Sequence, residues 1–272
     1  MFDLKTLLLP VDFSERSLEA ARQAKGIAGH FHSRLIVLNV AQTDRTTDLQ
    51  FEPGGSSAEE LQSYFNRELR ETPVEYTVKP GEPAGVIAAC AQQTGADLIV
   101  MAGHSRGAFE SFLLGSVTAD VLCSAPCPVW VSLHPQKGPA PLFRRILCAI
   151  GLSDSTSKTL DWALGFADAF EATCDVIHVC DNSGGDQLRR ITEDELTGAE
   201  RIGLGNVRAK LGDRGKLILA AGDLRKAVGT AWERLESDLL VIGRSQPGNE
   251  VAHVHNLGLT LAHTASCPVV MI

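Results

Sequence analysis

The sequence predicts an α/β protein of two tandem, doubly wound domains, each a mostly parallel five-stranded sheet with helices on both faces. Short apolar runs of strand length alternate with segments whose apolar residues recur at helical spacing. Such continuous runs are typical of parallel strands buried on both faces. The second half repeats motifs of the first, and a stretch rich in proline and glycine separates the halves.

The elements of the first half follow one another as strand and helix. The run from Lys5 to Val11 predicts the first strand, and Ser14 is expected to cap a helix over residues 15–30. The polar segment 41–57 predicts a surface loop. The remaining strands are predicted over 34–40, 74–78, 96–102 and 129–133, and the remaining helices over 58–69, over 83–93 and around Val117, Val121 and Leu122.

The second half repeats these signals. Asp97-Leu-Ile-Val corresponds to Asp238-Leu-Leu-Val, and the Cys-Pro-Val motif recurs at Cys127 and Cys267, an offset of 140 residues. Self-similarity over the full length indicates two copies of one α/β unit. The boundary falls in the stretch from His134 to Pro141. We therefore predict domains over residues 1–134 and 143–272, joined by a linker over 135–142.

Composition excludes several classes of partner. Of the 272 residues, 44% are hydrophobic and the formal net charge is −8, without a block of basic residues. Nucleic acid and anionic membranes are therefore not expected as partners. No apolar run approaches the roughly 20 residues of a membrane helix, and the N-terminal residues lack a signal-like pattern, so we expect a cytoplasmic protein. The seven cysteines, odd in number and mostly in apolar stretches, indicate reduced thiols.

The central feature is the segment from Asp97 to Gly107, continued through Gly115, Ser116 and Val117. An apolar run closed by glycines, then a loop, then Gly-Ser opening a helix, is how an α/β protein builds an anion cradle at the end of a parallel strand. Glycine followed by serine presents backbone N–H groups and a hydroxyl to phosphate oxygens. The pattern indicates an anionic ligand.

These motifs together resemble the universal stress protein family in its two-domain form. The resemblance rests on a strand followed by Pro-x-Asp, here Pro10 to Asp12, on Gly-Ser-Val at Gly115 and on Cys-Pro-Val-x-Val at Cys127, with a second, altered copy of this pattern in the other half. It implies a Rossmann-like fold related to the adenine nucleotide α-hydrolases. It also implies that ATP, with AMP or ADP as alternatives and Mg²⁺ as a companion of the nucleotide, binds at the carboxyl ends of the strands.

The resemblance also assigns roles to residues of the first half. Pro10 and Asp12 stand where the family flanks and hydrogen-bonds adenine, and Val40 stands where main chain meets the base. A buried carboxylate at a strand end can accept from an amino group. Met101 and Ala102 would line the ribose side. The predicted nucleotide-binding residues are Pro10, Asp12, Val40, Met101, Ala102, Gly103, Ser105, Gly115, Ser116 and Val117.

Departures from the family pattern occur in both halves. The Gly-x-x-Gly of the family is Ala102-Gly103-His104-Ser105 here, and side chains fit there only if the backbone avoids positive φ. His104 and Arg106 either add positive charge near the triphosphate or belong to a solvated loop. In the second half, Gly151 replaces the aspartate and His255-Asn256 replaces Gly-Ser. We expect no ATP site of the family type there.

Metal and catalytic sites are not predicted. His253, His255 and His263 lie near Cys267 in the sequence, but no partner has a recognisable ligand spacing. His178 is interpreted as a hydrogen-bonded core histidine. No Gly-x-Ser-x-Gly elbow, Walker loop or catalytic base is identified, so at most slow ATP hydrolysis is expected.

The functional hypothesis is a stress-response protein that binds ATP in its first domain as a regulatory switch. Occupancy would order the loop 103–114 and change what this surface offers an unknown protein partner. The alternative is a nucleotide-free structural or interaction module with decayed sites, and an adenylate-transferring enzyme is disfavoured because catalytic groups are missing. The apolar last strands, 129–131 and 269–271, are expected to form an intramolecular pseudo-dimer, with a homodimer as a further option.

Overall fold

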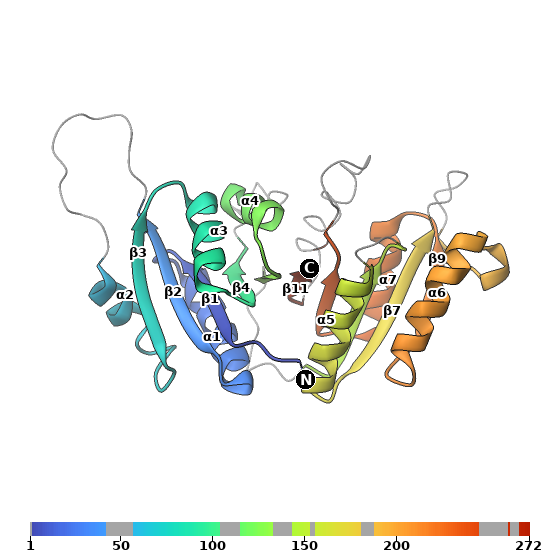
Figure 1. Cartoon of the computed structure of the whole chain (residues 1–272), viewed down its shortest axis with the longest axis horizontal. Helices are drawn as coiled ribbons and strands as arrows, with labels where there is room; N and C mark the ends of the chain where they lie inside the picture. The colour runs from blue at the N-terminus through green and yellow to red at the C-terminus, as the bar shows by residue number, and fades with distance from the viewer. Residues whose placement is uncertain are drawn as a thin grey trace. The chain divides into compact units, whose positions relative to one another are not determined.

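A computed structural model describes residues 2–41, 57–103, 115–132, 143–152, 156–180, 188–244, 261 and 267–272. The chain forms two compact units, the first of Asp3–Pro141 and the second of Leu142–Ile272 together with Met1–Phe2. Each unit is a sheet of mostly parallel strands with helices packed against it (Figure 1). The predicted α/β class is confirmed.

The first unit contains five parallel strands and four helices within the described ranges. Its elements are β1 (Thr6–Val11), α1 (Glu15–Phe31), β2 (Arg34–Ala41), α2 (Ala58–Phe65), β3 (Val74–Pro80), α3 (Pro83–Thr94), β4 (Leu98–Ala102), α4 (Ser116–Ser124) and β5 (Val129–Ser132). The strands lie in the order β3-β2-β1-β4-β5. Along the chain, β2 and β3 are added on one side of β1, and β4 and β5 are then added on the other. This reversal makes a topological switch point between β1 and β4, where open α/β sheets bind ligands.

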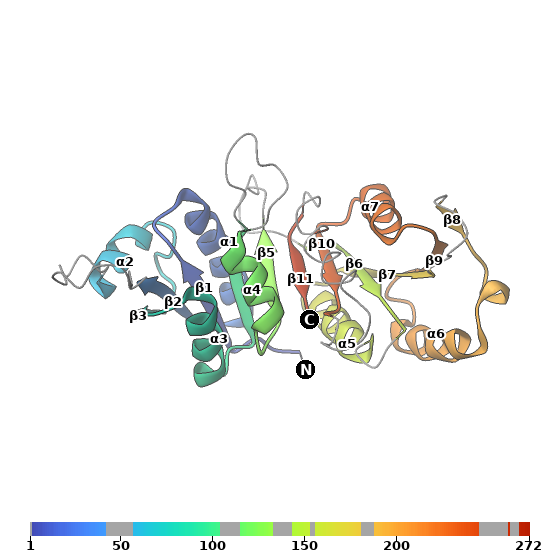
Figure 2. The same ribbon diagram turned by 90° about the horizontal axis from the view of Figure 1, so that it is seen from above.

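The second unit repeats this arrangement (Figure 2). Its elements are β6 (Arg145–Ile150), α5 (Thr156–Ala169), β7 (Thr173–Cys180), β8 (Arg189–Arg190), the 3-10 helix η1 (Glu193–Glu195), α6 (Gly198–Leu211), β9 (Leu217–Ala221), α7 (Leu224–Leu235), β10 (Leu239–Ile242) and β11 (Val269–Met271). The strand order is β11-β10-β6-β7-β9-β8. The short β8, antiparallel to β9, is an addition to the predicted five strands.

The strand cores are buried as their apolar runs predict. All of β4, and every residue of β1 except Thr6, is buried, since helices cover both faces of a parallel sheet. Trp130 of β5 is fully buried and donates its Nε1–H to Oε1 of Gln23 in α1, at 2.8 Å. Helix α2 ends at Phe65, four residues before the predicted end. The apolar spacing continues through a turn that keeps Leu69 buried, which is why periodicity overestimates the helix.

The aspartate of the repeated Asp-Leu-[Ile/Leu]-Val motif has a structural role in both units. Oδ2 of Asp97 accepts hydrogen bonds from the backbone N–H groups of Lys5 and Thr6, both at 2.8 Å. Oδ2 of Asp238 accepts from the N–H of Arg144, also at 2.8 Å. Each carboxylate therefore ties the start of one central strand to the start of its neighbour.

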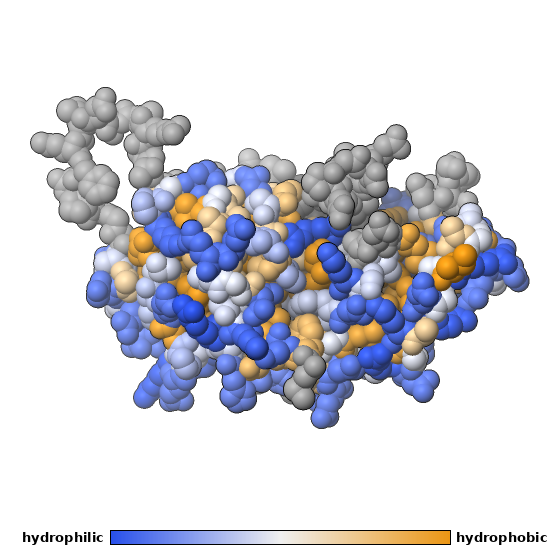
Figure 3. Space-filling view, viewed as in Figure 1, coloured by the Kyte–Doolittle hydropathy of each residue, from blue (hydrophilic) through white to orange (hydrophobic). Residues whose placement is uncertain are grey.

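The face of the molecule seen in Figure 3 is mainly hydrophilic. In the view of Figure 3, apolar side chains are scattered among charged ones. Within the described ranges, the large apolar residues that are exposed are Phe13, Leu188 and Ile202. Among the helices described, none combines the length and the apolar character needed to cross a membrane.

Candidate functional site

The candidate site of the first unit lies at the carboxyl edge of its sheet. Pro10 is buried near the end of β1, and Met101 and Ala102 are buried at the end of β4. Val40 is half-buried near the end of β2, paired with Lys79 of β3. Because parallel strands end at one edge of a sheet, the structure brings these predicted residues together beside the switch point. Their role in binding stays a prediction.

Asp12 lies in the turn between β1 and α1. Its Oδ1 accepts hydrogen bonds from the Ser14 N–H at 3.1 Å and the Ser17 hydroxyl at 2.6 Å, and Ser14 caps α1. The side chain is exposed. The expectation of a buried carboxylate was therefore wrong for this structure, because β1 ends at Val11 and residue 12 has already left the sheet.

At the end of β4, Ala102 stands in place of the first glycine of the family's Gly-x-x-Gly pattern. A side chain fits at this position only if the backbone avoids positive φ. Ala102 is not among the described residues with positive φ, so its methyl group fits without backbone strain. The N–H of Gly103 donates to the Ser132 carbonyl at 2.9 Å. The Gly103 carbonyl accepts from Nη1 of Arg16 at 3.1 Å, which places a cation of α1 beside this edge. Arg16 was not predicted as a site residue, because only the folded sheet brings α1 next to β4.

The N-terminus of α4 provides polar backbone groups at the same edge. Gly115 is the N-cap and makes no side-chain capping bond, so Ser116 and Val117 form a first turn without a side-chain cap. The positive end of the helix dipole favours an anion there. His104, Ser105 and Arg106, and the rest of the loop after Gly103 as far as residue 114, lie outside the described residues.

One buried polar side chain joins two strand ends in each unit. In the first unit, Asn39 of β2 pairs in register with Val11 and donates its Nδ2–H to the Val11 carbonyl at 2.9 Å. In the second unit, His178 of β7 pairs with Ile150, and its Nδ1 lies 3.2 Å from the Ile150 carbonyl oxygen. The prediction of a hydrogen-bonded core histidine is confirmed. The polar residue within each apolar strand run was the sequence signal for this link.

The second unit differs from the first where its nucleotide site would lie. Gly151, in place of the aspartate, is exposed, and a Cβ added there would meet no atom within 4 Å. Packing alone therefore does not require glycine. Burial raises the pKa of the Cys267 thiol to about 12, which keeps it protonated at neutral pH. His253, His255, Asn256 and His263 lie outside the described residues.

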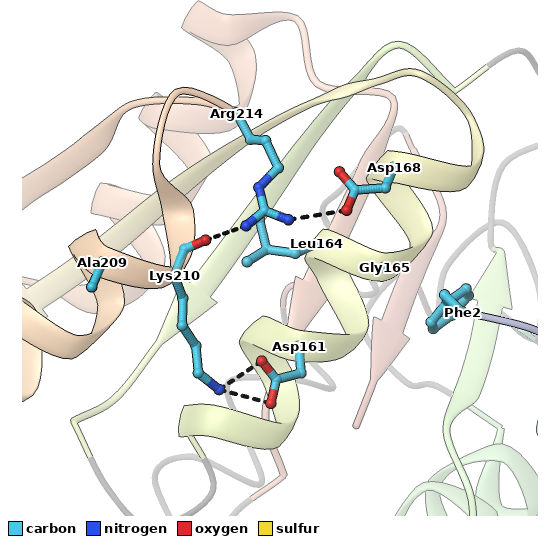
Figure 4. Close-up of a pocket in the computed structure, with 8 residues that line it drawn as sticks. All are labelled: Phe2, Asp161, Leu164, Gly165, Asp168, Ala209, Lys210 and Arg214. Atoms are coloured by element: carbon cyan, nitrogen blue, oxygen red, sulfur yellow. Dashed lines mark hydrogen bonds and ion pairs between the residues drawn. The ribbon is translucent and has the colours of Figure 1, made fainter.

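A depression of about 470 Å³ lies between α5 and α6, beside Phe2 (Figure 4). Its charges are paired with one another. Lys210 Nζ lies 2.6 Å from Oδ1 of Asp161, and Arg214 Nη1 lies 3.0 Å from Oδ2 of Asp168 (Figure 4). The first pair joins α6 to α5, and the second joins the turn after α6 to α5, so these charges are neutralised within the protein.

The comparisons with known proteins agree with this fold. The universal stress protein family model matches the chain twice, over residues 3–132 and 142–272. A universal stress protein of Methanocaldococcus jannaschii is 33% identical over 143 residues, covering 49% of this chain and 84% of that protein. One of Thermus aquaticus is 33% identical over 133 residues, covering 46% and 96%. The crystal structure of a universal stress protein from Archaeoglobus fulgidus, 19% identical, covers 99% of this chain and 96% of its own, with a TM-score of 0.74.

Proposed function

The chain belongs to the universal stress protein family in tandem form, and from this premise we propose that its first unit binds an adenine nucleotide as a regulatory ligand. ATP is the expected ligand, with AMP or ADP as alternatives. The nucleotide would set the state of a surface that a protein partner reads in the stress response. We propose a ligand rather than a substrate, because the one carboxylate described at this edge, that of Asp12, already accepts hydrogen bonds from Ser14 and Ser17.

One observation carries the proposal. The ends of β1, β2 and β4 and the start of α4 bring apolar, acidic and anion-binding groups to one edge beside the switch point. An adenine nucleotide has the matching chemistry, since its base is apolar and carries an amino donor while its phosphates are anionic.

The described residues fit such a ligand. The Asp12 carboxylate would accept from the adenine amino group, with the Val40 main chain beside the base. Met101 and Ala102 would line the ribose, and the Ala102 backbone admits its methyl group without strain. The first turn of α4 would hold the phosphates, which would bring Mg²⁺ with them when it is present.

The test identifies the nucleotide that copurifies with wild type and with Asp12→Asn. Asparagine keeps an Oδ1 acceptor for the Ser14 N–H and the Ser17 hydroxyl, and Ser14 still caps α1, while the carboxylate charge is lost. Asp3→Asn is the matched control, because this exposed aspartate precedes the opposite end of β1. Each freshly purified protein is denatured, and the released nucleotide is identified by chromatography.

We expect adenine nucleotide from wild type and Asp3→Asn, and at least tenfold less from Asp12→Asn. If the wild type releases none and added ATP leaves its melting temperature unchanged, the first unit holds no nucleotide. The nucleotide-free interaction module then becomes the better account. Equal release from wild type and Asp12→Asn would show that the carboxylate charge of Asp12 does not hold the nucleotide.

A further inference from the structure

We infer that His178, Cys180 and Glu200 form a binding site for Zn²⁺ or a chemically similar divalent transition metal in the second unit. The site lies at the carboxyl end of β7, against the first turn of α6. This inference is independent of the nucleotide proposed for the first unit, because all three residues belong to the other unit.

The three potential ligand atoms already lie close together. Nε2 of His178, Sγ of Cys180 and a carboxylate oxygen of Glu200 are all within 4.8 Å of one another. Sγ lies 3.6 Å from Nε2 and 3.8 Å from Oε1 of Glu200. Tetrahedral zinc with ordinary bond lengths separates neighbouring ligand atoms by about 3.5 Å. If separations of up to 4.8 Å contracted to about this value, the three atoms would occupy three corners of a zinc tetrahedron.

The strand and the helix explain this convergence. Residues 178 and 180 are two apart on β7, so their side chains project from the same face. Glu200 is the third residue of α6, and its carboxylate points back toward the helix start because it belongs to a capping box with Thr197.

His178 and Glu200 are each held in place by the side-chain polar atom that does not face the cluster. Nδ1 of His178 lies against the Ile150 carbonyl, which can only accept, so this nitrogen carries the proton and Nε2 presents its lone pair. Oε2 of Glu200 accepts from the N–H and hydroxyl of Thr197, at 2.8 and 2.7 Å, which leaves Oε1 toward the sulfur. Such outer hydrogen bonds orient metal ligands in proteins.

The Ile150 carbonyl orients the imidazole of His178, but Nε2 has only a weak partner for its lone pair among the described residues. The residue is 5% exposed, and within the described residues the atom facing Nε2 is the Cys180 sulfur at 3.6 Å. A thiol is a weak hydrogen-bond donor, so a buried imidazole nitrogen gains little from it. A metal ion would give this nitrogen a strong partner.

The donor set selects the class of metal. Imidazole, thiolate and carboxylate together suit zinc, whereas Mg²⁺ and Ca²⁺ prefer oxygen ligands. A thiolate and a carboxylate around a divalent cation also leave a neutral centre. Three protein ligands leave a fourth position for water or an exogenous ligand.

The first unit offers the natural comparison. β2 and β7 are both eight residues long, and Asn39 and Ala41 occupy the positions of His178 and Cys180. The first unit also has a capping-box glutamate, Glu60, on α2. The second unit thus gains the nitrogen and sulfur ligands on a framework that folds without them.

The variants follow from this comparison. His178→Asn can reproduce the Asn39 hydrogen bond to the neighbouring strand, Cys180→Ala reproduces Ala41, and Glu200→Gln keeps the capping box. The matched controls are Glu60→Gln, in the other capping box, and Cys123→Ala, which removes an exposed thiol. Circular dichroism melts verify that each variant folds.

Protein stripped with a chelator is titrated with Zn²⁺ by calorimetry and with Co²⁺ by absorption. We expect one ion per chain and a thiolate-to-cobalt charge-transfer band. Each of the His178 and Cys180 variants should weaken Zn²⁺ binding by about 100-fold, and Cys180→Ala should abolish the band. Both controls should bind like wild type.

Two results would overturn the inference. One is wild-type protein without stoichiometric Zn²⁺ binding, and the other is unchanged binding by the folded His178 and Cys180 variants, which would place the metal elsewhere. Nucleotide retention by the same variants separates this outcome from failure of the nucleotide proposal, since Asp12 is untouched.

Discussion

Replacing Gly165 by alanine is expected to destabilise the second unit, against the usual effect of this substitution in a helix. Gly165 lies inside α5, where alanine is normally favoured by about 1 kcal/mol. The Phe2 ring packs against it, however, and an added Cβ would lie 2.4 Å from Cδ2 and 2.9 Å from Cβ of Phe2. Because even the Cβ of Phe2 is too close, rotating the ring alone does not relieve the clash.

The cost follows from the contacts that Phe2 would lose. Its ring packs edge-to-face with Trp162, at a centroid distance of 5.6 Å, and with Phe166, at 6.3 Å. Each such pair contributes about 0.5–1.5 kcal/mol, so displacing Phe2 costs about 2 kcal/mol. After the gain in helix propensity, a net loss of about 1 kcal/mol remains, which lowers the melting temperature by about 2–4 °C.

A double-mutant cycle with Phe2→Ala tests this reasoning by thermal and urea unfolding. With Phe2 removed, Gly165→Ala should stabilise the unit by about 1 kcal/mol, so its effect changes sign. Gly229→Ala in α7 is the control, because a Cβ there meets no atom within 4 Å, and it should stabilise in both backgrounds. A stabilising effect of Gly165→Ala with Phe2 present would show that Phe2 does not obstruct the added methyl group.

Three further predictions concern thiols, a helix cap and the repeated aspartate. Burial raises the pKa values of the Cys174 and Cys267 thiols to about 12. Iodoacetamide should therefore label exposed Cys123, while labelling of Cys174 and Cys267 stays low from pH 7 to 9. A rise in their labelling over this range, measured by mass spectrometry, would contradict this. The Lys226 N–H lowers the pKa of Asp223, the N-cap of α7, below 3.8. The Asp223 carboxylate therefore contributes its full stabilisation above that pH, where urea unfolding should show that Asp223→Ala costs about 1 kcal/mol. The difference in unfolding free energy between wild type and variant should shrink as the pH falls below 3.8. A difference that stays constant with pH would show that the cap does not depend on the carboxylate charge. Asp97→Ala, which strands two backbone donors, should cost about 1–3 kcal/mol by urea unfolding, and a neutral effect would contradict its structural role.

Much of the fold could be predicted from the sequence because its signals are local. Strands buried on both faces appear as continuous apolar runs, and the tandem repeat indicates that the same domain architecture occurs twice. The recognition of the universal stress protein family is confirmed on the same motifs. Elements with weak local signals were not predicted, as with the two-residue β8.

The candidate sites were less predictable, because they depend on where strands and helices end. β1 ends at Val11 as predicted, but the turn that follows holds the Asp12 carboxylate against Ser14 and Ser17 and leaves the residue exposed. Arg16 reaches the end of β4 only in the folded sheet. His178 and Cys180 were visible in one strand, but their third partner, Glu200, is twenty residues away in the sequence and joins them through a capping box.

The stoichiometry of ATP binding, measured by calorimetry on nucleotide-free protein, tests the proposed function most directly. We predict one nucleotide per chain for wild type and Asp3→Asn, with binding weakened at least tenfold in Asp12→Asn. Two nucleotides per chain would show that the second unit also binds ATP despite Gly151. No binding to the wild type, or full binding by Asp12→Asn, would contradict a site built on Asp12.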